Sequence, residues 1–368
     1  MFKSKRTKKI LIIIISIILL IAIGLGIFFG ILTYRLDQIP KMTFTEMLDY
    51  TTANNKEAVI TVGIIQNGEV SYNVYGKDGA TIEQKEHIYE IGSITKTVTA
   101  TMIYKAIEEK KLSLNDQIDK YLTLPQKDYY PTVKRLLTHT SGYSSHYFES
   151  EMIGNFFAGR NDFYGISKEK LTGRIGEIDL KDKDYDYEYS NFGYAVLGSL
   201  LSEIYGKEYT KLVNTFMQEE LGLKNTRISD RQGDLGNYWD WQENDAYLPA
   251  GGLTSTIGDM LAYAALQLNS APSYLTDTHH KLSNISGNTD KNEKMNIHVD
   301  YMGAAWVGDN ANGVIWHNGG TGNYNCYIGF DKKNQIAVVI LSNLSPGYRI
   351  PATVMGIKLL TDLQGLNG

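Results

Sequence analysis

Cysteine is almost absent from this chain. Cys326 is the single cysteine in 368 residues, so the sequence excludes an intramolecular disulfide and a zinc site built from cysteines. Because Cys326 stands in an apolar run, we expect its thiol to be buried as a small hydrophobic group. Hydrophobic residues make up 43% of the chain, enough for one large domain or two closely packed ones.

Several catalytic motifs are absent as well. No H-E-x-x-H, G-x-S-x-G or P-loop pattern occurs, so a zinc peptidase, a nucleophile-elbow hydrolase and an NTPase lack support. Positive charge is concentrated in the first nine residues, which hold five of the 36 basic residues and no acid. The remaining 31 basic and 41 acidic residues give a net charge of about −10. An acidic body argues against a nucleic-acid partner.

The longest apolar run lies directly after the basic start. Residues 10–34 contain no charged side chain, and as a helix they would measure about 37 Å, enough to cross a bilayer core. No A-x-A-like cleavage site and no lipobox cysteine follows. We therefore expect a cytoplasmic tail at 1–9, a single-pass transmembrane signal anchor at 10–34, a juxtamembrane segment at 35–57 and an extracellular domain at 58–368 of a cell-membrane protein.

Alternating and helical patterns place strands at both ends of the body and helices between them. Residues 59–65 and 69–75 alternate around Asn67-Gly68, which predicts a tight hairpin. We expect an antiparallel sheet whose halves are far apart in sequence, an inserted and mostly helical region, and a cleft between the two. The predicted helices are 41–57, 93–110, 191–205, 209–221, 256–268 and 350–363, and the later strands are 302–307, 314–316, 324–330 and 336–342.

A serine and a lysine stand three residues apart where the helix 93–110 is expected to begin. On a helix, Ser93 and Lys96 share one face, so the amine can lie beside the hydroxyl. A serine needs such a base to become a nucleophile, and free N–H groups at a helix start can bind an oxyanion. The pattern alone is weak evidence. Residues 167–170 repeat it in a polar stretch, which we interpret as a solvated helix face.

Two later stretches add side chains that suit the same chemistry. Tyr189 is followed two residues later by Asn191, and a phenol whose pKa is lowered by cations could accept and return the serine proton. Asn191 starts a predicted helix, where its amide could bind a substrate carbonyl or act only as a cap. In the stretch 316–322, glycines let a substrate approach a strand, and His317 could supply a cationic or hydrogen-bonding group.

These three motifs occur in the order S-x-x-K, Y-x-N and H-x-G, the pattern of the beta-lactamase-related serine hydrolases. The chain resembles this family, which includes class C beta-lactamases, low-molecular-weight penicillin-binding proteins, D-aminopeptidases and esterases. The flanking runs 135–142, 189–206 and 249–256 also look like family signatures, and the resemblance covers roughly 58–363. It implies an α/β (α+β) fold of the beta-lactamase/transpeptidase type, with an antiparallel sheet flanked by helices.

The resemblance also implies roles for individual residues. Ser93 would be the nucleophile, Lys96 and Tyr189 would activate it, and His317 would complete the catalytic set. The backbone N–H groups of Ser93 and Gly320 would form the oxyanion hole, and the substrate-binding residues would be Asn191, Gly319 and Thr321. The Asn191 amide could alternatively orient the lysine. No metal or organic cofactor is implied. Histidine often titrates near neutral pH, so we expect carboxylate recognition by His317 to be weak or pH-dependent.

We assign no catalytic role to three further histidines and two aromatic stretches. We expect a structural role for His139 and surface positions for His279 and His280. The stretches 143–164 and 237–247 could be lids over the cleft or ordinary packing aromatics, and the sequence does not separate these readings.

We therefore predict an extracytoplasmic serine hydrolase that works through an acyl-enzyme on Ser93. Its substrate would be small or part of the cell wall, either a D-alanyl peptide or a D-alanyl ester. A true beta-lactamase is an alternative. An alternative of another class is a catalytically silent binding or sensing protein that keeps the cleft and the membrane anchor.

Overall fold

The structure is a computed structural model that describes residues 37–269 and 272–365, in two units, 1–43 and 44–368. The described part of the first unit contains the short 3-10 helix η1 (Ile39–Lys41), which begins with Pro40. The predicted tail at 1–9 and anchor at 10–34 lie outside the described residues. Among the residues that are described, no helix is both long and apolar enough to span a bilayer.

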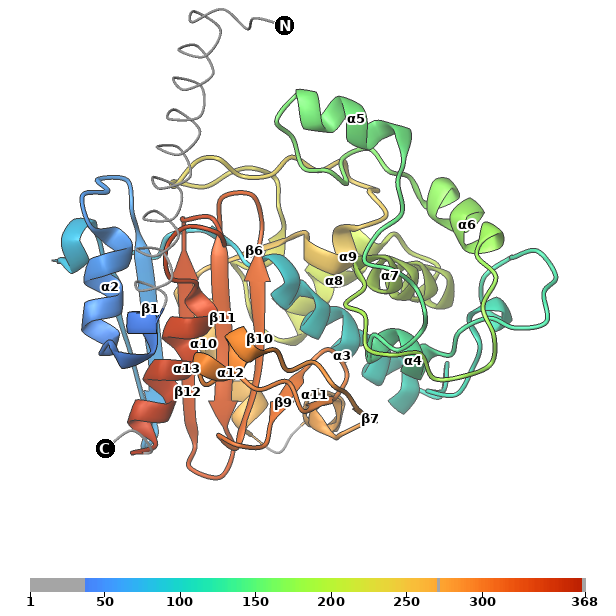
Figure 1. The fold of residues 1–368 in the computed structure, drawn as a ribbon. Helices are drawn as coiled ribbons and strands as arrows, with labels where there is room; N and C mark the ends of the chain where they lie inside the picture. Colours follow the sequence, from blue (N-terminus) through green and yellow to red (C-terminus); the bar gives the residue numbers. More distant parts are fainter. Residues whose placement is uncertain (1–36, 270–271, 366–368) are drawn as a thin grey trace, which may run out of the picture. The chain divides into compact units, whose positions relative to one another are not determined.

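The second unit is built on a sheet that joins the two ends of its sequence. Within the described residues, nine antiparallel strands run in the order β3-β2-β1-β12-β11-β10-β9-β8-β7 (Figure 1). Early strand β1 pairs with β12, the last strand of the chain, which confirms the predicted sheet with sequence-distant halves. The strands are β1 (Ile60–Gln66), β2 (Glu69–Tyr75), β3 (Thr81–Ile82), β7 (Ser283–Asn284), β8 (Tyr301–Met302), β9 (Val307–Asp309), β10 (Val314–Gly320), β11 (Asn325–Asp331) and β12 (Ile336–Ser342).

Both faces of the central strands are covered by helices. Gly63 of β1 lies in register with Val339 of β12 and Ile328 of β11, and this face packs against α10 (Ile257–Leu268). The neighbouring residue Tyr327 points to the other face, where it contacts α13 (Ala352–Leu363). Because both faces are covered, every residue of β11 and β12 is buried, as expected for strands with no solvent face.

The inserted region is mainly helical, as predicted, and holds a second, three-stranded sheet. In that sheet β6 lies between β4 and β5. The strands of this sheet are β4 (Tyr89–Glu90), β5 (Arg227–Ile228) and β6 (Leu253–Ser255). The other helices are α2 (Phe44–Thr52), η2 (Lys77–Gly79), η3 (Gly92–Ile94), α3 (Thr95–Glu108), η4 (Ile118–Lys120), α4 (Val133–Leu137), α5 (Ser150–Phe157), α6 (Lys168–Glu177), α7 (Asn191–Tyr205), α8 (Tyr209–Thr215), η5 (Phe216–Glu220), α9 (Leu248–Gly251), α11 (Ser273–Thr276), η6 (Asp277–His279) and α12 (Asp290–Lys294).

Turn and capping residues explain why several predicted elements begin and end where the structure has them. Asn67 and Gly68 have φ of 55° and 80°, the left-handed pair that a two-residue hairpin turn requires. Ser190 caps α7 by accepting a hydrogen bond from the Gly193 N–H at 2.9 Å, and Gly206 ends the helix with φ of 62°. The predicted bounds 191–205 and 336–342 are therefore confirmed.

Four predictions were wrong where tertiary packing overrides the local pattern. The predicted helix 41–57 is confined to α2, and the predicted strand 302–307 is broken into β8 and β9 by a turn that buries Trp306. The predicted strand 314–316 continues to Gly320. His279 is 5% exposed because its Nε2 bonds the Gln267 side chain at 2.8 Å, so it is not a surface residue. Cys326 is buried, as predicted.

The doubly covered centre of the sheet makes a prediction about stability. Ile340 on β12 is fully buried, so Ile340→Ala should lower the free energy of unfolding by about 2–5 kcal/mol through lost transfer energy and an unfilled cavity. Val70→Ala on β2, where the side chain is 59% exposed, should change it by less than about 0.5 kcal/mol. Urea unfolding of both variants checks this, and equal losses would contradict it.

Candidate active site

The predicted nucleophile stands at the entrance of the helix predicted to carry it. Ser93 lies in η3, directly before α3, and Lys96 follows in the first turn of α3. The Lys96 Nζ lies within hydrogen-bond distance of the Ser93 Oγ, at 3.0 Å. The predicted juxtaposition of amine and hydroxyl on one helical face is therefore present in the structure.

The Lys96 side chain is buried and held by three oxygen atoms. Besides its contact with Ser93, its Nζ donates to Asn191 Oδ1 at 2.7 Å and to the Ala250 carbonyl at 2.6 Å. No carboxylate is among these partners, and burial lowers the pKa of Lys96 well below its usual range. Such an environment favours a neutral amine. The two N–H groups of a neutral amine are used by Asn191 Oδ1 and the Ala250 carbonyl, so its lone pair is left for the Ser93 hydroxyl and can accept the serine proton. Asn191, at the start of α7, orients the lysine, one of the two roles that the resemblance implied.

Tyr189 meets the same hydroxyl from the other side, but its phenol is not acidic. It hydrogen-bonds Ser93, and its ring centroid lies 4.8 Å from the Lys96 Nζ. Burial nevertheless raises the pKa of Tyr189 above its ordinary value, and the bond to Ser93 opposes this only in part. The expectation that cationic neighbours lower this pKa is wrong, because the only nearby amine is itself favoured in its neutral form. Tyr189 is therefore a neutral proton donor.

Strand β10 passes very close to η3, and glycines make this approach possible. A Cβ atom on Gly319 would lie 1.9 Å from the Ile91 carbonyl oxygen and 3.3 Å from the Ser93 backbone nitrogen. A Cβ atom on Gly92, where φ is 49°, would lie 2.6 Å from the Gly320 nitrogen. The backbone nitrogens of Ser93 and Gly320, the predicted oxyanion donors, thus come from two segments in direct contact.

His317 on β10 is buried and neutral. Its Nδ1 bonds the Asn318 carbonyl at 2.6 Å, and its ring centroid is 6.5 Å from that of Tyr189. Burial, helped by the charge that Lys96 can carry, lowers the pKa of His317 to about 3. A neutral His317 offers no cation to a substrate carboxylate, so of the predicted alternatives the structure favours a hydrogen-bonding group and weak, rather than pH-dependent, carboxylate recognition. The imidazole can still act as a hydrogen-bonding group.

Thr321, predicted to bind substrate, is turned away from the serine. Its Oγ1 donates to Glu90 Oε2 at 2.6 Å, and the Trp239 backbone N–H donates to Glu90 Oε1, also at 2.6 Å. Glu90 is 3% exposed, so one buried carboxylate ties the end of β10 to the segment that carries Trp239. The sequence reasoning missed Glu90 and Trp239, and the only available signal was an acid three residues before the serine.

His139 supports the site from behind, as expected for a structural residue. Its Nδ1 accepts a hydrogen bond from the Ser190 N–H at 3.0 Å, and its ring centroid lies 4.6 Å from that of Tyr189. Its backbone φ is 58°, an uncommon value for a residue with a side chain. The ring thereby fixes the backbone immediately after Tyr189.

Aromatic side chains form the walls of the cleft at Ser93. They come from both aromatic stretches, 143–164 and 237–247, whose role the sequence did not decide. The cleft has a volume of about 80 Å³. Phe163 and Tyr247 are stacked with ring centroids 4.3 Å apart, and Trp239 meets Trp241 edge-on. No lysine or arginine is among its described lining residues, which are Ser93, Phe163, Asn191, Trp239, Trp241, Tyr247, Ala250, Gly251 and Gly320.

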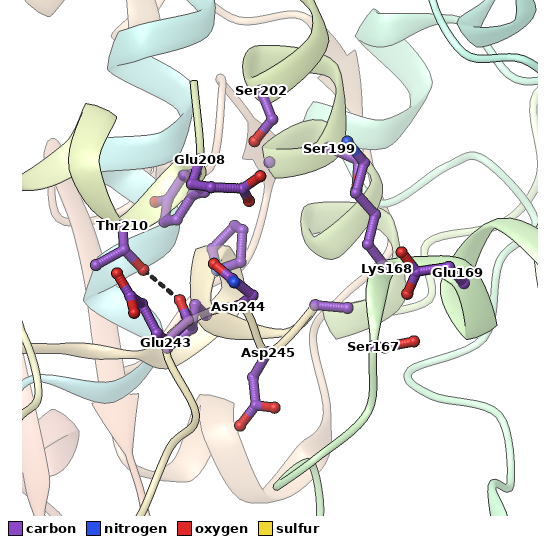
Figure 2. A pocket seen from close by; sticks show the side chains of 15 residues that line it. Ser167, Lys168, Glu169, Ser199, Ser202, Glu208, Thr210, Glu243, Asn244 and Asp245 are labelled. Carbon is purple, nitrogen blue, oxygen red and sulfur yellow. Dashed lines mark hydrogen bonds between the residues drawn. The ribbon is translucent and has the colours of Figure 1, made fainter. Parts of the chain in front are cut away.

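A larger hollow of about 260 Å³ lies apart from these residues. Figure 2 shows its lining, in which carboxylates and hydroxyl groups predominate. It includes Ser167, where the S-x-x-K pattern recurs. There Ser167 caps α6, and the Lys170 Nζ lies 2.5 Å from Glu151 Oε1 instead of reaching Ser167 Oγ. The second copy of the motif is a capped, ion-paired helix start. Within 37–269 and 272–365, no three His, Cys, Asp or Glu side chains are grouped as a metal ion would need.

The chain belongs to the Beta-lactamase family, which it matches over residues 45–353. This confirms the resemblance drawn from the three motifs and the predicted class, a beta-lactamase-related serine hydrolase. Protein flp of Staphylococcus aureus is 26% identical over 318 residues, which cover 77% of this chain and 59% of that protein. The chain thus spans less than two thirds of the length of this relative.

Two solved structures show the same fold. A beta-lactamase/D-alanine carboxypeptidase from Yersinia pestis superposes with a TM-score of 0.70 at 19% identity, over 90% of this chain and 99% of that one. The octameric penicillin-binding protein homologue from Pyrococcus abyssi gives a TM-score of 0.66 at 22% identity, over 83% and 73%. These similarities confirm the predicted beta-lactamase/transpeptidase-like fold.

Glu90 makes a prediction about stability and pH. Burial raises its pKa from 4.5 to about 7, so the folded chain retains this proton to a higher pH than the unfolded chain does. Its contribution to stability is therefore full below pH 4.5 and declines as the pH rises towards 7, by about 3 kcal/mol in all. Glu90→Gln keeps an acceptor for Trp239 and removes the titration.

The expected result is that Glu90→Gln gains stability relative to the wild type as the pH rises from 4.5 to 8. Urea unfolding across this range measures the difference, with Glu177→Gln on the surface of α6 as the control. A difference between wild type and Glu90→Gln that does not vary with pH would contradict the prediction.

Proposed function

We propose that this protein is a membrane-anchored, extracytoplasmic serine hydrolase that cleaves D-alanyl esters of the cell envelope through an acyl-enzyme on Ser93. The observation that carries the proposal is the cleft beside Ser93. It is walled by four aromatic side chains, its described lining holds no lysine or arginine, and the nearby His317 is neutral. The anchoring at 10–34 and the extracellular location rest on the sequence alone.

The acylation step follows from the protonation states at the site. Neutral Lys96 accepts the proton of the Ser93 hydroxyl, 3.0 Å away, while Oγ forms a bond to the ester carbonyl carbon. The negative charge that develops on the carbonyl oxygen is received by the N–H groups of Ser93 and Gly320. Tyr189, with its raised pKa, then donates its proton to the departing alkoxide and regains one from Lys96.

Deacylation reverses these proton movements. A water molecule on the Tyr189 side gives a proton to neutral Lys96 and attacks the acyl carbon. The bond to Ser93 Oγ then breaks, and Lys96 returns this proton to the departing Ser93 Oγ. D-alanine is released with both its amino and its carboxyl group. Asn191 and the Ala250 carbonyl hold Lys96 in place through both steps.

The aromatic walls favour an acyl group that carries an ammonium ion. A D-alanyl ester presents such a cation beside the scissile carbonyl, and aromatic faces attract cations by about 0.5–2 kcal/mol. A D-alanyl-D-alanine peptide or a beta-lactam instead presents a carboxylate near the scissile bond, which a cation would have to neutralise. The described lining of the cleft supplies none. Arg160 and Arg231 line the adjoining groove instead, where Arg160 is paired with Asp240, so the geometry at Ser93 supports an esterase better than a carboxypeptidase or a beta-lactamase.

The substrate preference can be tested with the purified full chain. We expect hydrolysis of a soluble D-alanyl ester with kcat/KM about two- to thirtyfold higher than for the matched N-acetyl-D-alanyl ester, because one cation–π contact is worth about 0.5–2 kcal/mol. Release of D-alanine from a D-alanyl-D-alanine peptide should be slower than from the ester. A faster reaction on the peptide would identify a carboxypeptidase instead.

Ser93→Ala should reduce the ester hydrolysis by about 10³-fold or more, because the acyl acceptor is lost. Intact mass after incubation with a fluorophosphonate should show one adduct on the wild type and none on Ser93→Ala. Ser167→Ala, at the second S-x-x-K copy, is the matched control and should keep both the activity and the adduct. A folded wild type without turnover and without an adduct would support the binding or sensing alternative.

A third prediction concerns the pH profile. Because Lys96 must be neutral to act as the base, kcat/KM should rise with pH and level off below the ordinary lysine pKa of about 10.4. His317→Gln should leave the midpoint of this rise unchanged, because His317 is already neutral above about pH 3. A midpoint near pH 6.5 that disappears in His317→Gln would show instead that the imidazole titrates in the working range.

A further inference from the structure

Helix α5 carries an apolar stripe on its outer side. Among the described residues, six large hydrophobic side chains are exposed, and four of them fall within ten positions of the chain. Phe148 is 64% exposed, Ile153 52%, Phe156 74% and Phe157 82%. These four residues are called the α5 stripe below. In Figure 1, α5 lies at the periphery of its unit, away from the large sheet.

The orientation of α5 is set by a polar residue that faces inward. Asn155 is 6% exposed and is the one buried residue of the helix. Its side-chain amide donates to the backbone carbonyls of Asp162 at 3.1 Å and Tyr164 at 2.8 Å. An ordinary surface helix buries its apolar face and exposes its polar one. In α5 only Met152 packs against the core, while the other apolar side chains are exposed and the most buried residue is polar. The buried amide anchors the loop after α5 and thereby forces the stripe outward.

The acidic residues on the N-terminal side of the stripe are neutralised by ion pairs. Glu149 is 3.0 Å from the Arg174 guanidinium, and Glu151 is 2.5 Å from the Lys170 Nζ. Arg160, beyond the end of the helix, pairs with Asp240 at 3.1 Å. The acids next to the stripe on its N-terminal side are thus paired with cations, and Asp162, beyond the C-terminal end of α5, is an exposed carboxylate near it.

We propose that the α5 stripe inserts into the headgroup and acyl boundary of a lipid bilayer. With roughly 150–250 Å² offered by each aromatic side chain, the stripe exposes on the order of 500 Å². A stable protein partner needs about 800 Å² on each side, so the stripe is too small for a lasting dimer. It suits an amphipathic helix lying in the membrane plane, whose apolar side enters by about 5–10 Å.

The tether supplies the second reason for a lipid partner. This inference rests on the anchor in the proposed function, at residues 10–34. Only nine residues, 35–43, separate its end from α2, and even fully extended they reach about 30 Å. The second unit is thereby held near the bilayer at a high effective concentration, so a weak apolar contact suffices to dock it.

Docking of α5 would place the cleft next to the membrane. Phe156 of the stripe and Trp239 line one groove of about 760 Å³, and Trp239 also lines the cleft at Ser93. With the stripe in the bilayer, the groove opens at the lipid surface. An ester-bearing polymer that is attached to a lipid would enter there.

The test uses the full chain with a cysteine at Phe157. Cys326 is buried and its thiol pKa is raised to about 12, so an environment-sensitive dye will label only Phe157→Cys. In nanodiscs that hold one copy each, the dye should shift to shorter emission wavelengths and be quenched about twofold or more by lipids spin-labelled near the headgroup. The dye on Val70→Cys, another exposed apolar position, on β2 outside the stripe, should remain in water.

Absence of quenching at Phe157→Cys in these nanodiscs would overturn the proposal. A wavelength shift that arises only when several copies share a vesicle would also overturn it, because a second copy would then cover the stripe. A full chain that does not float with liposomes would overturn the anchor and the docking together, while hydrolysis of the soluble ester would still test the proposed function.

A functional comparison separates docking from catalysis. The double variant Ile153→Ser, Phe157→Ser changes two stripe residues that do not line the cleft or the groove. It should hydrolyse a soluble D-alanyl ester at the wild-type rate and a lipid-linked D-alanyl polymer in vesicles about tenfold more slowly, because apolar insertion adds about 1.4 kcal/mol or more to the docked state. Equal rates on the vesicle substrate would contradict a role for docking.

Discussion

The chemistry of this protein depends on one amine kept out of water. Lys96 has three oxygen partners and no carboxylate, so burial favours its neutral form. The neutral amine influences the protonation states of the neighbouring Tyr189 and His317. It gives Tyr189 no fixed cation that would make the phenol acidic, and any charge it does carry opposes protonation of His317. The site therefore consists of three groups that are neutral at the start of the reaction.

Close packing of two segments from opposite ends of the sequence supplies the rest of the site. η3 follows the early hairpin, whereas β10 belongs to the last strands, and they touch because β1 pairs with β12. The glycines at 92 and 319 allow the backbones to approach within atomic contact. Glu90 then ties the end of β10 to the aromatic wall through Thr321 and Trp239. Shape and charge of the cleft thus follow from one antiparallel pairing and one buried carboxylate.

The cleft at Ser93 and helix α5 both expose aromatic side chains where polar ones would be usual. In the cleft, four aromatic rings and no described lysine or arginine surround Ser93, which is the basis on which we propose a cationic acyl group. On α5, a polar amide is buried and aromatic rings are exposed, which suits contact with lipid. Both arrangements cost stability relative to ordinary packing, and each is understandable if the substrate is an ester on a polymer at the membrane surface.

The sequence by itself determined the family, the order of the three motifs, the hairpin at Asn67-Gly68 and the helix 191–205, because each depends on residues that are close together in the chain. It also placed Ser93 and Lys96 on one face, since helical spacing alone decides that. Only the tertiary structure decided the protonation of Tyr189 and His317, because burial depends on segments far away in sequence. It alone turned Thr321 towards Glu90 and Phe157 towards solvent, since the partners of these side chains cannot be read from local patterns.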